Sequence, residues 1–119
     1  MTIHLTARTM ALAGLTIFGL VTPAMAEGPA ISTKWLDLTQ SQDDCLTKAE
    51  AAVTATGFEK IERTQQSRYG TADGYTGAIR CISEKAIVMF VVSGNDRGTA
   101  ERASMELFKA FVGRAASSR

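Results

Sequence analysis

Two stretches of the chain carry hydrophobic residues at the spacing of one helical face. The first predicts a helix over residues 42–56, whose buried stripe is Cys45, Leu46, Ala49, Ala52 and Val53. Ser41 can cap the start of this helix, and Gly57 can end it in a left-handed conformation that brings Phe58 to Val53. The second predicted helix is capped by Asp96 and ends at Gly113, and its stripe is Ala100, Ala103, Ser104, Leu107, Phe108, Phe111 and Val112.

Between and before these helices the hydrophobic residues alternate with polar ones or run continuously, as they do in strands. The pattern predicts strands at residues 35–38, 58–69, 75–82 and 86–92, with an Asp73-Gly74 turn before the third. The element order is therefore β-α-β-β-β-α. This order predicts an α+β fold, a two-layer sandwich with two helices on one face of a mainly antiparallel four-stranded sheet.

The first 26 residues have the three parts of a cleavable signal peptide. Arg8 supplies positive charge, residues 10–21 form an apolar run, and Ala24-Met25-Ala26 matches the small-x-small cleavage pattern. The alternative is a membrane anchor, but a spanning helix needs about 20 apolar residues and this run is shorter. We therefore expect a bacterial-type protein exported to the periplasm or secreted, with no stable membrane anchor after cleavage. Residues 27–31 would be a flexible lead-in, and residues 32–119 a single small domain.

Cys45 and Cys81 are the two cysteines of the chain. In an oxidising compartment an even count predicts a disulfide, here between the first helix and the third strand. A redox-active pair is the alternative, but such cysteines usually lie close together in sequence, as in Cys-x-x-Cys. The bridge would turn the strand face with Gly77, Ile79 and Cys81 toward the helix, and Gly77 would let the helix backbone approach closely.

Charge and residue types exclude several classes of function. After cleavage the formal net charge is zero, because Arg8 is the single charged side chain of residues 1–26 among 13 basic and 12 acidic residues. Nucleic-acid binders carry a basic excess, so we expect no nucleic-acid partner. The only histidine, His4, lies in the signal peptide. This removes histidine-based nucleophile systems and zinc sites, and we expect no enzyme, no catalytic residues, no cofactor and no metal.

Two polar segments are candidate binding sites. Arg63, Arg68 and Arg80, with Tyr69 and Tyr75 near them in sequence, are a candidate anion patch. The acidic residues between them favour a solvated sheet face with ion pairs instead. Residues 93–99 join a strand to a helix, where phosphate loops occur, but they match no phosphate-binding motif and Asp96 would repel an anion, so a plain turn is favoured.

The last strand is apolar on both of its faces, whereas helices can cover one. If alternate residues of this strand lie opposite the helices, an uncovered apolar face results, which predicts an interaction site: Ala78, Ile82, Val88, Phe90 and Val92. Shielding by Trp35, by the lead-in or by sheet curvature is the alternative. The sequence therefore favours a non-enzymatic interaction module that binds another envelope protein or a second copy of itself. A small anionic-ligand-binding protein is the second hypothesis.

Overall fold

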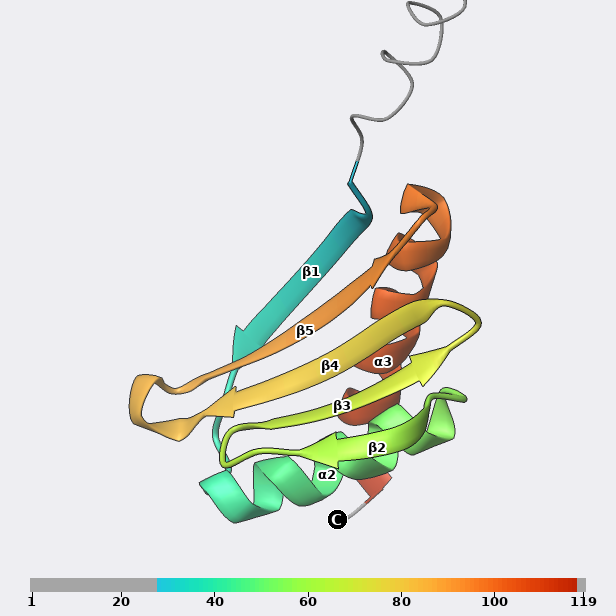
Figure 1. Ribbon diagram of the computed structural model, residues 1–119. Helices are drawn as coiled ribbons and strands as arrows, with labels where there is room; N and C mark the ends of the chain where they lie inside the picture. The colour runs from blue at the N-terminus through green and yellow to red at the C-terminus, as the bar shows by residue number, and fades with distance from the viewer. Residues whose placement is uncertain (1–27, 118–119) are drawn as a thin grey trace, which may run out of the picture.

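The computed structural model describes residues 28–117 (Figure 1). The predicted signal peptide, residues 1–26, lies outside the described residues, as does Glu27 of the lead-in. The elements are β1 (Ala30–Asp37), α2 (Gln42–Ala55), β2 (Glu59–Arg63), β3 (Ser67–Ala72), β4 (Tyr75–Ile82), the 3-10 turn η2 (Ser83–Lys85), β5 (Ile87–Gly94) and α3 (Arg97–Ser117).

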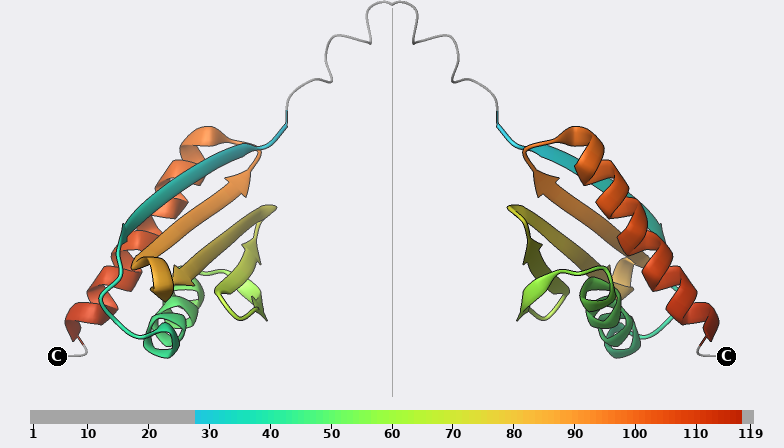
Figure 2. Two further views of the ribbon diagram at one scale, coloured as in Figure 1. Left: turned by 90° about the vertical axis from the view of Figure 1, so that its left-hand side faces the viewer. Right: turned by 90° about the vertical axis from the view of Figure 1, so that its right-hand side faces the viewer.

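The strands form one five-stranded sheet in the order β1-β5-β4-β3-β2, and every neighbouring pair is antiparallel. Both helices pack against one face of it, which lies behind the sheet in Figure 1, and Figure 2 shows the two layers from the sides. The predicted α+β fold with two helices and an antiparallel sheet is confirmed. The predicted number of four strands is wrong.

The additional strand arises because residues 58–69 do not form one strand. The chain turns after Arg63, where the side-chain oxygen of Thr64 accepts hydrogen bonds from the backbone N–H groups of Gln66, at 3.2 Å, and Ser67, at 2.9 Å. A threonine can close a turn in this way without glycine or proline, so the segment lacks the usual turn signal. The predicted Asp73-Gly74 turn is present, with positive φ angles of 50° and 81° between β3 and β4.

The limits of two elements also differ from the prediction. β1 begins at Ala30, which pairs with Gly94, so the predicted flexible lead-in is wrong for Ala30 and Ile31. Helix α3 continues through Gly113 to Ser117. Gly113 is exposed, and a Cβ built at this position would have no atom of the described residues within 4 Å.

Helix α2 confirms its predicted signals. The Ser41 side chain accepts a hydrogen bond from Asp44 N–H at 3.2 Å, and the five residues of the predicted stripe are all buried. At its end Gly57 has φ +95° and donates to Thr54 O, while Phe58 donates to Val53 O. These two bonds are those of a Schellman cap, which satisfies the last carbonyl groups of the helix.

Helix α3 is capped as predicted, since the Asp96 carboxylate accepts from Thr99 N–H at 2.8 Å. Its buried face packs on β5, where the ring of Phe90 makes edge contacts with Phe108 and Phe111 at centroid distances of 5.4 Å. Six residues of the predicted stripe are buried or half-buried, whereas Val112 is exposed.

The predicted disulfide is present and ties α2 to β4. Cys45 and Cys81 are both fully buried, with their Cα atoms 6.1 Å apart. The strand face with Cys81 meets the helices, as predicted. The reason for glycine at position 77 is different, however: a Cβ there would lie 2.6 Å from the ring of Phe58, so Gly77 makes room for this ring and not for the helix backbone.

Candidate interaction site

The pairing of β4 with β5 decides which residues of the sheet lie under the helices. Cys81 pairs with Val88, Ile79 with Phe90 and Gly77 with Val92. Because directly opposite residues of an antiparallel pair share a face, these six residues all lie on the helix side. The prediction of Val88, Phe90 and Val92 as part of an uncovered face is therefore wrong: all three have no exposed surface and belong to the core.

The opposite face of the sheet has no helix over it within residues 28–117. From β5 it carries Ile87, Met89 and Val91, which alternate with the three buried residues and are half-buried. From β4 it carries Ala78 and Ile82, also half-buried. The prediction thus placed Ala78 and Ile82 on the correct face. It joined them to the wrong set of β5 residues.

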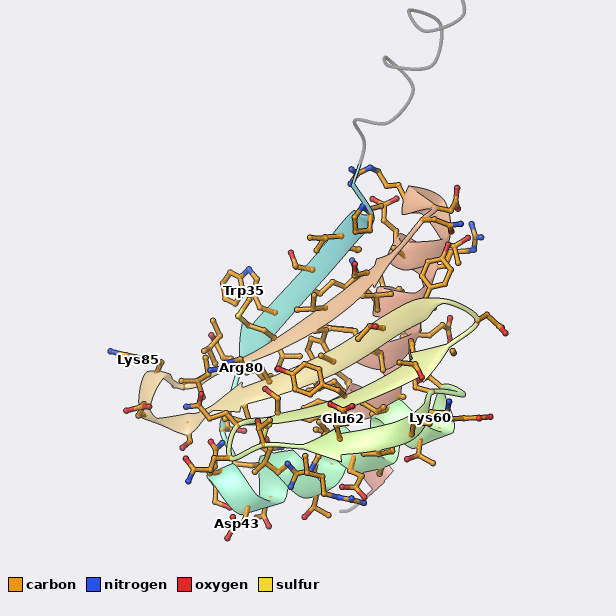
Figure 3. All side chains as sticks on the ribbon, in the orientation of Figure 1. Trp35, Asp43, Lys60, Glu62, Arg80 and Lys85 are labelled. Carbon is orange, nitrogen blue, oxygen red and sulfur yellow. A yellow bond between two sulfur atoms is a disulfide. The ribbon has the colours of Figure 1, made fainter. Side chains whose placement is uncertain are left out.

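Strand β1 adds the most exposed apolar side chains of this open face. Trp35 pairs with Met89 and is 63% exposed, and Ile31 pairs with Ser93 and is 57% exposed. The sequence predicts Trp35 only as a possible shield of the apolar face. Figure 3 views the open face and shows Trp35 on it, as part of the surface itself. We call this surface the open face and define it by Ile31, Trp35, Ala78, Ile82, Ile87, Met89 and Val91.

Polar residues lie beside and within this apolar surface. Arg80, labelled in Figure 3, pairs with Met89. Its guanidinium donates to the side-chain oxygens of Ser67, at 3.3 Å, and Gln66, at 2.5 Å. Further toward β2, Tyr69 pairs with Ala78, and Glu62 pairs with Tyr69. The open face therefore carries apolar side chains along β1 and β5, with Thr33 and the charged Asp37 between and beside them on β1 and the positive charge of Arg80 on β4, and it becomes polar toward β2.

The three arginines of the predicted anion patch do not come together. Arg63 and Arg68 lie on the helix side, where both bind Glu50 of α2, at 2.7 Å and 3.2 Å. The hydrogen bond from Arg63 lowers the pKa of the Glu50 carboxyl, with smaller contributions from the charges of both arginines. Arg80 lies on the open face. The ion-pair interpretation accounts better for Arg63 and Arg68, although their acidic partner lies on a helix and not on a neighbouring strand.

The segment 93–99 is a turn with its polar groups used internally. The Asp96 carboxylate caps α3, and the Tyr75 hydroxyl accepts from Asp96 N–H at 3.1 Å and donates to Asn95 Oδ1 at 3.0 Å. Hydrogen bonds from Thr99 lower the pKa of Asp96, so its carboxylate stays charged at the helix start. A bound anion would face this negative charge, which agrees with the turn favoured from the sequence.

A shallow cavity of about 440 Å³ lies between the end of α2, the β3–β4 turn and α3. Phe58, Ala72 and Tyr75 are among its lining residues, and Asp73, Arg102 and Glu106 also line it. The lining therefore includes both acidic and basic groups.

Within residues 28–117, no three cysteine, aspartate or glutamate side chains gather as a metal site would require. None of the helices in this range has the length and apolar character needed to cross a bilayer. Comparisons of the chain with models of protein families, with curated proteins and with solved structures found no match.

Proposed function

We infer that the protein is a small exported, non-enzymatic interaction module that binds a partner protein through the open face. The observation that carries this inference is a two-layer fold whose helices cover one face of the sheet while the other face is also apolar. Trp35 and Ile31 are more than half exposed on that face. Contiguous apolar surface of this kind on a folded domain is typical of binding sites.

Two features support export. The N-terminal 26 residues have the pattern of a cleavable leader. The folded domain contains a disulfide between two buried cysteines, and such bonds form and persist in oxidising compartments. Mass spectrometry of the protein from its native host tests this part: we expect a chain that begins at Glu27 and has no free thiols. An intact leader or two free thiols would refute it.

The open face also indicates the chemistry of the partner. Aromatic and methionine side chains are enriched at protein interfaces, and Trp35 and Met89 pair directly on this face. Arg80 lies beside Met89 and has only uncharged partners among the described residues. The complementary surface is therefore an apolar protein surface with a carboxylate opposite Arg80, because an arginine desolvated at an interface needs an acceptor.

Two methionines provide a matched test. Met89→Glu puts a charge in the middle of the open face, and Met105→Glu makes the same change on the exposed side of α3. Tagged wild type and both variants are cross-linked in envelope preparations, and the products are quantified by mass spectrometry. We expect specific partners to be lost with Met89→Glu and retained with Met105→Glu. Equal capture by all three proteins would refute binding through the open face.

A further inference from the structure

The two edges of the sheet differ in how well they are protected against pairing with another strand. β2 has five residues, four of them charged, and a bulge at which Lys60 has φ +54°. Short length, charge and bulges are the usual means of blocking an edge. β1 has eight residues in unbroken register with β5. Figure 2 (left) shows its outer side with no other described element across it.

The direction of the backbone groups on β1 follows from one hydrogen bond. Leu38 N–H donates to Ala86 O at 2.9 Å, one step beyond the Asp37–Ile87 pair. In an antiparallel ladder, residues that bond to a neighbouring strand alternate with residues that do not. The even-numbered residues of β1 therefore bond to β5, and the odd-numbered residues direct N–H and C=O outward from the edge.

A second bond, at the other side of the sheet, gives the same result. Cys81 N–H donates to Gln66 O at 2.7 Å, so the odd-numbered residues of β4 bond to β3 and its even-numbered residues bond to β5. The even-numbered residues of β5 therefore bond to the even-numbered residues of β1, and the odd-numbered residues of β1 again have no backbone partner among residues 28–117. Their side chains are also those on the open face.

The exposed side chains on β1 are arranged symmetrically. Ile31 and Trp35 lie two residues before and two residues after Thr33, at 57% and 63% exposure. The other exposed large hydrophobic residues of the described chain, Met105 and Val112, are less exposed and lie on α3. One strand thus combines backbone groups that have no partner in the described part of the chain with two apolar side chains placed evenly about its centre.

We propose that two copies of the chain pair antiparallel along β1, about a two-fold axis at Thr33, so that their sheets join into one. Thr33 faces Thr33 of the second copy, and Trp35 faces Ile31 of the second copy on the open face. Each of these pairs exchanges two backbone hydrogen bonds, because all of their N–H and C=O groups point outward. Aromatic and β-branched side chains directly opposite each other stabilise such pairs.

The charges on β1 favour this register over the one with the axis at Lys34. Moving the axis to Lys34 would place Lys34 opposite itself and Ile31 opposite Asp37, and like charges directly opposite are unfavourable. With the axis at Thr33, Lys34 faces Ser32 instead. The pairing extends the proposed function, because both open faces lie on the same side of the joined sheet and form one larger apolar surface for the partner.

A proline substitution separates this edge from the rest of the fold. Thr33→Pro removes an N–H that bonds only across the two-fold axis, whereas Lys34→Pro removes one that bonds to β5. The full chain is expressed in a bacterial host, and the form that the host produces is studied by analytical ultracentrifugation over a wide concentration range. We expect wild type and Thr33→Val to show a monomer–dimer equilibrium. Thr33→Pro should raise the dissociation constant of the dimer by about tenfold or more, with little change in the midpoint of unfolding. Lys34→Pro should lower the midpoint of unfolding.

A cysteine substitution tests the register without disturbing the backbone. Hydrogen-bonded residues face each other at a Cα separation of about 5.5 Å, which suits a disulfide. Thr33→Cys should therefore form a covalent dimer in air, and Asp37→Cys, further along the same strand, should not. Monomeric wild type at every concentration, or equal cross-linking by both cysteines, overturns the proposal.

The same measurements distinguish this proposal from the proposed function. Self-association that persists in Thr33→Pro but is lost in Met89→Glu means that copies pack face to face, which overturns the edge pairing and leaves the open face as a binding surface. Self-association that is lost in Thr33→Pro, together with equal partner capture by wild type and Met89→Glu, supports the edge pairing and refutes the open-face function.

Discussion

Reduction of the disulfide between Cys45 and Cys81 should remove a large part of the stability of this domain. The bond joins positions 36 residues apart in the sequence and ties α2 to β4, and both of its cysteines belong to the hydrophobic core. When the bond is broken, the folded state keeps the same packing, but the unfolded chain gains freedom. The loss therefore depends mainly on the length of the loop.

For a loop of this length, the chain-entropy relation gives a loss of about 4 kcal/mol at 25 °C. A domain of this size is ordinarily stable by about 5 to 13 kcal/mol, so the bond accounts for a third or more of the total. At about 4–8 °C for each kcal/mol, the midpoint of thermal unfolding should fall by roughly 15–30 °C.

The measurement is urea unfolding followed by the fluorescence of Trp35 and by circular dichroism, with and without a reducing agent. Reduced wild type keeps both sulfur atoms and so measures the cross-link alone. The double variant Cys45→Ala/Cys81→Ala should lose more stability than reduced wild type, because both sites are fully buried and the missing sulfur atoms leave cavities. The slope of free energy against urea should increase on reduction, because the unfolded chain exposes more surface.

A loss of less than about 1 kcal/mol on reduction, with an unchanged slope, would refute this reasoning. It would mean that the unfolded chain is already restricted between these positions, or that the bond strains the folded state. A reduced protein that is fully unfolded would also be informative, since it would place the stability without the bond below zero.

Three further predictions concern single side chains. Gly77→Ala should lower the free energy of unfolding by about 1–3 kcal/mol, because the new Cβ overpacks against Phe58. Gly113→Ala should raise it by about 0.5–1 kcal/mol, because the new Cβ has nothing within 4 Å on an exposed turn of α3. Urea titrations compare the two variants. Phe90→Ala should cost about 3–5 kcal/mol, and the adjacent Met89→Ala about 1 kcal/mol, because the two side chains lie on opposite faces of β5; similar costs would contradict the assignment of the faces. Glu50→Gln should cost up to about 1 kcal/mol at neutral pH, since it removes the ion pairs with Arg63 and Arg68. These partners lower the folded-state pKa of Glu50, so the stability they contribute is fully present above the unfolded-state pKa and is lost as the pH falls through the folded-state pKa. The stabilities of wild type and Glu50→Gln should therefore become equal in acid. A difference in stability that persists in acid would contradict the ion-pair explanation.

Local signals in the sequence were sufficient for helix α2, for the start of α3 and for one hairpin, but not for the end of α3. Ser41, Gly57 and Asp96 define helix caps through short-range hydrogen bonds, and Asp73-Gly74 can adopt the positive φ angles that a tight turn needs. Each of these features depends on residues that are neighbours in the chain. The turn at Thr64 was missed because a side-chain oxygen forms it, and threonine is equally common in strands.

The composition of the open face could be predicted only in part. Alternation along β5 showed two apolar faces, and the disulfide showed which face of β4 meets the helices. Neither observation shows which β5 residues share that face, because this depends on the register between the two strands. Trp35 and Ile31 were missed as members of the site because the position of β1 beside β5 is a long-range pairing that the alternation within β1 does not reveal.

The sequence by itself determined the two helices, the strands other than the division into β2 and β3, the cysteines available for a bridge and the apolar character of both faces of β5. The tertiary structure decided which of those faces is buried. Four residues, Ser83 to Ala86, separate the paired residues Ile82 and Ile87. Ala86 adopts a left-handed conformation with φ +56°, which the sequence does not predict because this conformation is usually formed by glycine or asparagine. One residue more or fewer in this connection would shift the register by one position and move every β5 side chain to the opposite face. The identity of the open face therefore depends on the geometry of a turn, which becomes definite only when the two strands pair.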